Sequence, residues 1–283
     1  MAAVDKKGKD PDAELGSEDK RTLGGSSATR VLGLLDLFTP EMPIWTVDMF
    51  QEHLQLARAT AYRYARELHN AGFLVPAAGG GYVLGPRFIE FDRQIRLGDP
   101  LMRVAPAIME SQRELVDGAQ LLCAFYGDRV LTIHQDRTDD NIAMSMERGR
   151  PFPLFRGAPS RIILANLAPY QMRNMFLTHS QTISAEGLGD NWPEFRDRMK
   201  AIRKRGYYVG SEIDKTLVGV AAPIFRTPDA VAGCLCFVRL KDQTSEADHE
   251  FLGQAVIAAA ARISEGVQST GDQILHPVSR GTR

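Results

Sequence analysis

The apolar positions between residues 28 and 86 recur three times at helical spacing and then alternate in two short runs. This pattern predicts a first helix from Ala28, a second from Thr46 to Leu54, and a third from about Arg58 to Asn70. The runs "FLV" and "YVLG" flank "PAAGGG", whose glycines can adopt positive φ at the tip of a hairpin. The segment is therefore predicted to fold as helix, helix, tight turn, helix and hairpin.

At 100° per residue, the third predicted helix separates a cationic face from an apolar face. The cationic arc contains Arg58, Ala59, Tyr62, Arg63, Arg66 and His69. The opposite arc contains Ala61, Tyr64, Leu68 and Ala71. The order of elements is that of a winged helix-turn-helix, so we expect Arg58, Tyr62, Arg63 and Arg66 to contact double-stranded DNA, with Tyr82 of the hairpin nearby. A merely solvated surface is the other interpretation of a cationic face, and the order of the elements rather than the charge favours DNA.

Beyond residue 86 the pattern changes twice. Residues 87–117 predict one or two amphipathic helices that link the hairpin to the rest of the chain. Residues 118–270 combine paired strands with several helices, "NIAMSME" among the strands and Ala247 to Val267 as a long last helix. Strands grouped in hairpins with helices beside them predict an α+β domain on a largely antiparallel sheet.

Composition and charge refine this organisation. The chain has 283 residues, 44% of them apolar and 24% charged, which suits a globular protein of two domains. Residues 1–27 hold almost no large apolar side chain, so we expect a disordered tail there, and residues 271–283 are expected to form a second tail. The formal net charge is −1, and the segment from Ala28 to Arg87 balances five arginines against five acids. One such module would bind DNA weakly, so we expect two modules in a homo-oligomer.

The sequence contains no apolar segment of signal-peptide or membrane-spanning type, so we expect a cytoplasmic protein without a membrane partner. The alternation in "CLC" is more typical of buried packing than of a metal site with His134, and neither a metal nor a cofactor is predicted. We find no nucleophile elbow, HExxH motif, P-loop or glycine fingerprint, so no catalytic residues are expected. The alternatives are an enzyme that transforms a small molecule on the C-terminal domain, and an interaction scaffold built on the small residues of the last helix.

Several segments, taken together in this order and spacing, resemble the IclR family of bacterial transcription regulators. They are "RVLGLLDLF", "LARATAYRYARELHNAGFL" with "GYVLGPR", "FPLFRGAPSRIILA", "RGYYVGSEI", "LVGVAAPIF" and "GCLCFVRL". The resemblance extends from about Ala28 to Gly266. It implies an N-terminal winged helix-turn-helix at 28–86, linker helices at 87–117 and a GAF-like domain at 118–270 that binds a small-molecule effector, in a dimer or tetramer.

The resemblance also assigns site residues. The family's recognition helix maps to Arg58 through Arg66, where Ala57 and Ala59 replace a proline and a serine, and Thr60 can supply the missing hydroxyl. The sensor pocket maps to Met144, Phe152, Ala158, Pro159, Gly210, Leu217, Gly219, Cys236 and Val238. The helix start from Gly157 to Ser160 offers free N–H groups to a carboxylate, with Arg156 and Arg161 nearby.

The last strand indicates what kind of effector to expect. Cys236 and Val238 share one strand face, where members of the family that sense very small polar acids have two serines. The pocket is therefore expected to be apolar, which favours an aromatic or otherwise bulky organic acid or a close derivative. Phe125, Phe152, Phe155 and Met144 are candidates to pack against its ring, and plain core packing is an equal alternative for each.

Overall fold

The computed structural model describes residues 26–138, 142 and 147–269. They divide into two compact units, one up to Arg96 and one from Leu97 onward, and each unit is described by itself. The tails predicted at 1–27 and 271–283 lie outside the described residues, apart from Ser26, which caps the first helix, and Ser27, which begins it. Met144 and most of the strand predicted at "NIAMSME" also lie outside them.

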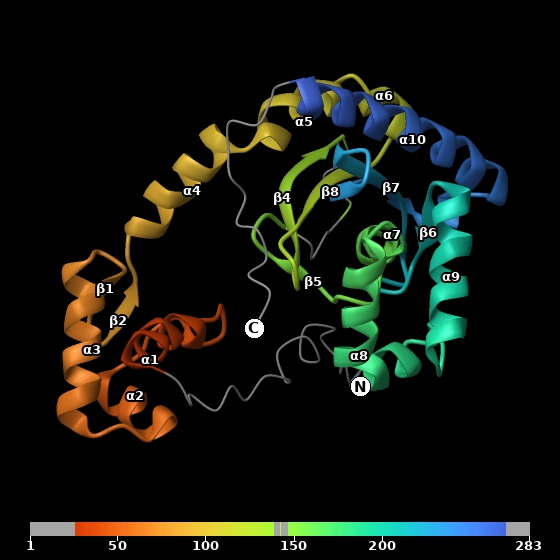
Figure 1. Ribbon diagram of the computed structural model, residues 1–283. Helices are drawn as coiled ribbons and strands as arrows, with labels where there is room; N and C mark the ends of the chain where they lie inside the picture. The colour runs from red at the N-terminus through yellow and green to blue at the C-terminus, as the bar shows by residue number, and fades with distance from the viewer. Residues whose placement is uncertain (1–25, 139–141, 143–146, 270–283) are drawn as a thin grey trace, which may run out of the picture. The chain divides into compact units, whose positions relative to one another are not determined.

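The first unit consists of short helices and a small hairpin, labelled in Figure 1. Its elements are α1 (Ser27–Gly33), η2 (Leu35–Leu37), α2 (Val47–Leu54), α3 (Arg58–Asn70), β1 (Leu74–Pro76), β2 (Tyr82–Leu84) and α4 (Arg87–Gly98). The Thr46 hydroxyl accepts the Met49 N–H and caps α2, which ends at Gln55 in the left-handed conformation. The turn of Gln55, Leu56 and Ala57 then leads directly into α3.

One small core holds the first unit together. Its buried residues are Leu34, Trp45, Phe50, Ala61, Tyr64, Ala65, Leu68 and Leu74. The rings of Trp45 and Phe50 stack at a centroid distance of 5.7 Å. The antiparallel hairpin is turned by Gly79 and Gly80, which have φ of +88° and +87°, and a bridge between Trp45 and Tyr82 fastens it to the helices.

The second unit is built on an antiparallel sheet of six strands in the order β5-β4-β3-β8-β7-β6. Its strands are β3 (Ala119–Phe125), β4 (Val130–Arg137), β5 (Pro151–Phe152), β6 (Tyr208–Gly210), β7 (Leu217–Thr227) and β8 (Ala230–Leu240). Its helices are α5 (Pro100–Glu110), α6 (Arg113–Val116), α7 (Ala158–Ala165), α8 (Pro169–Ala185), α9 (Trp192–Arg205), η3 (Lys241–Gln243) and α10 (Glu246–Ser269).

Helices cover both faces of this sheet, and Figure 1 shows α5 and α10 along one side and α7 to α9 on the other. Because side chains alternate along a strand, the even positions of β8 differ from the odd ones in their surroundings. Leu235 and Phe237 pack in the core under α5 and α10, whereas Cys234, Cys236 and Val238 pack in the core under α7 to α9. The second face therefore carries Cys236 and Val238, two of the residues expected at the effector site.

Three features differ from the sequence-based predictions. The linker predicted at 87–117 is not one segment, because α5 buries Leu101, Ala105 and Met109 in the second unit while α4 buries no residue. Strands β5 and β6 were not predicted, since two and three residues are too few to show alternation. Ala71, which the helical wheel places on the apolar arc, is exposed because it lies at the C-terminal cap of α3.

Candidate functional site

The two faces of α3 differ as the sequence predicts. Ala61, Tyr64, Ala65 and Leu68 are buried in the first unit's core. Four of the residues expected to contact DNA, namely Arg58, Tyr62, Arg63 and Arg66, are exposed on the other side of the helix. The folded unit therefore presents them together on one surface.

Thr60 and Tyr82 lie less openly than those four residues. Thr60 is half-buried in the first turn of α3. Tyr82 is half-buried in β2, where its ring lies 6.3 Å from that of His69 and its backbone bonds to Trp45. The hairpin of β1 and β2 thus exposes only part of the Tyr82 side chain.

Ion pairs distinguish the three arginines of α3. Arg58 Nε lies 3.5 Å from Asp48 Oδ1, and Arg66 Nη2 lies 3.7 Å from Glu67 Oε1. Arg63 forms no ion pair with any described residue, and its guanidinium lies 5.5 Å from the ring centre of Tyr64. Since an acid partner competes with a phosphate or a base edge, Arg63 is the most available cation of this helix.

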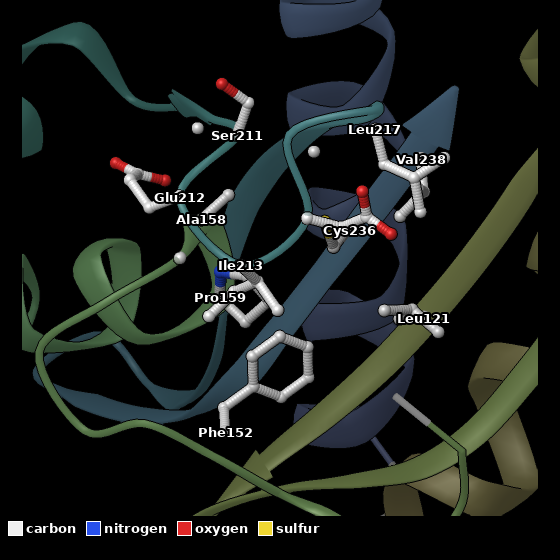
Figure 2. Close-up of a pocket in the computed structure, with 14 residues that line it drawn as sticks. Leu121, Phe152, Ala158, Pro159, Ser211, Glu212, Ile213, Leu217, Cys236 and Val238 are labelled. Atoms are coloured by element: carbon white, nitrogen blue, oxygen red, sulfur yellow. The ribbon is translucent and has the colours of Figure 1, made fainter. Parts of the chain in front are cut away.

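A cavity with about 470 Å³ of space, part of it open to solvent, lies in the second unit. It is bounded by the sheet, by the start of α7 and by the segment that joins β6 to β7. Its lining residues are Leu121, Phe152, Gly157, Ala158, Pro159, Gly210, Ser211, Glu212, Ile213, Asp214, Leu217, Gly219, Cys236 and Val238. Figure 2 shows Leu121, Cys236 and Val238 on one side, with Ser211 and Glu212 across from them.

The sheet forms an apolar wall of this cavity. Strand register sets Leu121 opposite Cys236 and Gly219 opposite Val238, so these residues of β3, β7 and β8 share one patch. Burial raises the pKa of the Cys236 thiol well above its usual value. Because a thiolate rather than a thiol is the nucleophile and metal ligand, Cys236 acts here as a small apolar group.

The start of α7 forms a second wall. Gly157 is its N-cap residue, with φ of +87° and no side chain that caps the helix. A Cβ at this position would lie 2.8 Å from a side-chain carbon of Ile213, so both the backbone and the space favour glycine. The uncapped N-terminus directs its partial positive charge at the cavity edge.

The segment from Ser211 to Thr216 forms the wall opposite the sheet, and α7 holds it through Arg161. Arg161 Nη1 forms an ion pair with Glu212 Oε1 at 2.8 Å and donates a hydrogen bond to the Tyr208 hydroxyl. The Tyr208 hydroxyl in turn donates to Glu212 Oε1 at 2.8 Å. Burial raises the pKa of Tyr208, so its hydroxyl remains a proton donor at neutral pH. Arg161 is thus bound to Glu212, and Arg156 lies 3.9 Å from Glu186, so neither arginine is an unpaired cation for a ligand.

The structure brings together nine of the residues expected at the effector site. These are Phe152, Gly157, Ala158, Pro159, Gly210, Leu217, Gly219, Cys236 and Val238. Phe155 and Ser160 are buried without lining the cavity, and the Phe155 ring packs instead 5.3 Å from that of His179. Met144 lies outside the described residues.

Leu121 and the run from Ser211 to Asp214 line the cavity without having been predicted. Leu121 could have been found by pairing its strand with that of Cys236. "SEID" lacks any periodicity, and its signals are its place between two strands and the resemblance of "RGYYVGSEI" to the family.

Among the described residues, no three His, Cys, Asp or Glu side chains are grouped so that they could hold a metal ion. In the part of the chain that the structure describes, no helix combines the length and the apolar character needed to cross a membrane.

Comparison with known proteins gives matches over nearly the whole described chain. The model for the C-terminal domain of bacterial IclR transcriptional regulators matches residues 99–265, and the model for the IclR helix-turn-helix domain matches residues 27–77. The HTH-type transcriptional regulator KipR of Bacillus subtilis (strain 168) is 25% identical over 246 residues, which cover 86% of this chain and 98% of KipR.

Solved structures share the fold at lower identity. A transcriptional regulator from Rhodococcus sp. RHA1 has a TM-score of 0.69 at 20% identity, covering 87% of this chain and 99% of that one. An IclR homolog from Microbacterium hydrocarbonoxydans, solved in complex with 4-hydroxybenzoate, has a TM-score of 0.67 at 20% identity and covers 86% of this chain and 100% of that one.

These findings confirm the predicted fold class, an N-terminal helix-turn-helix with a small hairpin followed by an α+β effector domain. They also confirm the prediction that the chain is no enzyme, because the matched family consists of regulators. A regulator of this kind requires a surface for DNA and a pocket for an effector. The first unit has a helix with an exposed cationic face, and the second unit has a cavity beside its sheet. The chain belongs to the IclR family of bacterial transcriptional regulators and consists of a DNA-binding helix-turn-helix domain and a C-terminal effector domain.

Proposed function

We propose that this regulator binds its operator through the exposed face of α3 in two symmetry-related copies, and that an aromatic or other organic acid in the cavity modulates this binding. The operator contacts proposed are Arg58, Thr60, Tyr62, Arg63, Arg66 and Tyr82. Two copies are needed because the first unit carries no excess of positive charge, and each further phosphate contact adds to affinity. The operator is chromosomal DNA, so the protein acts in the cytoplasm.

The observation that carries the ligand class is the contrast between the two walls of the cavity. Leu121, Cys236 and Val238 offer apolar surface to a ring or chain, with Phe152 beside them (Figure 2). The uncapped start of α7 offers N–H groups to a carboxylate. The 4-hydroxybenzoate bound by the Microbacterium relative supports an acid with an aromatic ring.

Regulation requires that the effector bind two arrangements of the protein with different affinities. Such couplings are typically about 1–3 kcal/mol. Along the chain, α4 leads from the DNA-binding unit into the effector unit. We propose that the effector changes the relative pose of two recognition helices through this helix.

Self-association is supported by the surface of α4. Phe88, Phe91 and Ile95 recur at positions i, i+3 and i+7, so they lie on one face of the helix, and all three are exposed. Phe88 and Phe91 both contact Phe73, with ring centroids 5.3 and 5.8 Å apart, which fixes the start of α4 on the first unit. An exposed apolar stripe of this kind is typical of a contact with a second chain.

We expect Ile95→Glu to weaken self-association by at least about tenfold, because a carboxylate would replace an apolar contact. Sedimentation velocity across a dilution series measures the change. Leu177→Glu places the same carboxylate at an exposed aliphatic residue of α8, in the other unit, and should leave the oligomer intact. If the Ile95→Glu variant and the unsubstituted protein sediment equally, the subunits do not associate through this stripe.

The proposed effector class is tested by a thermal-shift screen of aromatic and aliphatic acids on the full chain. We expect acids that raise the melting temperature to lose at least about tenfold in affinity in Val238→Phe, because the larger side chain occupies the cavity. Ala230→Phe adds the same bulk at the exposed far end of β8 and should not weaken them. If a ligand binds both variants equally well, the effector site does not lie in this cavity.

A further inference from the structure

The cavity of the second unit is lined by two acidic side chains and, among the described residues, by no basic one. Glu212 and Asp214 both belong to the segment that joins β6 to β7, across from the apolar wall of the sheet. A carboxylate that is drawn out of bulk water requires a counter-ion or hydrogen-bond donors in return. The two acids differ in whether the protein itself supplies that counter-ion.

The protein neutralises Glu212 with a cation of its own. Its Oε1 forms an ion pair with Arg161 Nη1 at 2.8 Å and accepts a hydrogen bond from the Tyr208 hydroxyl at 2.8 Å. Its Oε2 is buried, so a ligand in the cavity cannot touch that oxygen. A ligand therefore meets Glu212 as one half of a neutral pair rather than as a free charge.

Asp214 is held through one oxygen only. Its Oδ1 accepts from the Thr216 N–H at 2.8 Å and from the Thr216 hydroxyl at 2.6 Å. These bonds orient the carboxylate within its own turn and leave Oδ2 without a donor from any described residue. The side chain is half-buried, and Oδ2, unlike Glu212 Oε2, keeps surface that solvent can touch. Asp214 Oδ2 is therefore a charged acceptor that a ligand can reach.

The lysines near this segment do not neutralise Asp214. Lys215 follows it directly in the chain and is exposed, and Lys241 donates from Nζ to Ser211 Oγ at 3.3 Å. Neither lysine forms an ion pair with Asp214, and neither lines the cavity. Cations that stay in solvent also contribute little to a charge beside them. The described residues thus leave the cavity with one negative charge that has no counter-ion.

From this arrangement we infer that the effector is a zwitterion, an acid that also carries a protonated amino group, and that this ammonium pairs with Asp214. The inference rests on the proposed function, since it names the ligand class of the same cavity. The carboxylate of the ligand binds at the uncapped start of α7, and its apolar body lies against Leu121, Cys236 and Val238 (Figure 2). A simple acid of the same shape would add a second negative charge and leave Asp214 uncompensated.

The test compares acids that differ in the amino group alone. Isothermal calorimetry on the full chain would use 3- and 4-(aminomethyl)benzoate against 3- and 4-ethylbenzoate, and phenylalanine against 3-phenylpropanoate. These pairs place the amine at different distances from the carboxylate, and in the benzoates an ammonium replaces a methyl group of similar size. We expect the best amine-bearing acid to bind at least about tenfold more tightly than its partner, because its ammonium donates to a charged acceptor.

Asp214→Asn removes the charge and keeps the shape of the side chain. The Thr216 N–H and hydroxyl both donate to Oδ1, so the carbonyl oxygen of asparagine stays there and its NH₂ group takes the place of Oδ2. The preference for the amine should vanish, because a donor would then face the ammonium, while the ethyl acids should bind at least as well as before. Asp229→Asn removes the same charge from an exposed residue between β7 and β8, outside the cavity, and should keep the preference.

The outcomes separate the two proposals. If the unsubstituted protein binds the acids with and without an amine equally, the role of Asp214 is overturned and the proposed effector class stands. A preference that persists in Asp214→Asn would also overturn that role. If no acid of the set binds, the proposed effector class is overturned and the inference with it. The ligand comparison on the unsubstituted protein does not depend on how the variant folds.

Discussion

Arg63→Ala is expected to weaken operator binding by at least about thirtyfold. A guanidinium contact to a guanine edge contributes about 1–3 kcal/mol, and two recognition helices lose it together, so the total is about 2–6 kcal/mol. Arg63 should matter more than its neighbours because Arg58 and Arg66 already face Asp48 and Glu67. Fluorescence anisotropy with a duplex selected from genomic fragments by the unsubstituted protein measures the change.

The control for Arg63 is Arg198→Ala, which removes the same charge from an exposed position of α9 in the other unit. It should leave DNA binding nearly unchanged. Effector affinity should be retained in both variants, since the cavity belongs to the second unit. Full operator affinity in a folded Arg63→Ala protein would show that another surface reads the DNA, and loss of both ligands together would indicate unfolding.

Phe50→Ala is expected to destabilise the DNA-binding unit by about 3–5 kcal/mol. Phe50 is fully buried, stacks on Trp45 and meets the edge of Phe38 at 6.1 Å. A unit of this size is stable by only about 4–10 kcal/mol, so a large part of its stability would be lost. We expect operator binding to fail at physiological temperature while the effector unit stays folded.

Differential scanning calorimetry of the full chain separates the two units, because only the transition of the first unit should move. Leu32→Ala, a change at an exposed residue of α1, is the matched control and should shift that transition little. A Phe50→Ala protein with an unchanged transition would mean that the core around Trp45 tolerates the cavity. A shift of both transitions would show that the two units unfold together.

In the cavity, the local sequence pattern predicts which residues of one strand share a face but not which residues of other segments lie beside them. Period 2 along β8 predicts that Cys236 and Val238 share a face, and the structure places both in the cavity. The partners of that face follow from strand register, which depends on segments more than a hundred residues apart in the case of Leu121 and Cys236. The ion pair of Glu212 with Arg161 of α7 could not be predicted from local pattern either, because the two residues lie about fifty positions apart in the chain.

The amino-acid pattern alone determined the DNA-binding unit almost completely, including α3 from Arg58 to Asn70 and the glycine-tipped wing. Those features depend on helical period, capping and turn chemistry, which act between residues close in the chain. Only the tertiary structure decided that Arg58 of α3 is paired with Asp48 of α2, that the Phe155 ring packs against His179, and that Glu212 forms an ion pair with Arg161 of α7. Such contacts join residues of separate elements, and no local period records which side chains will meet once the sheet and helices pack.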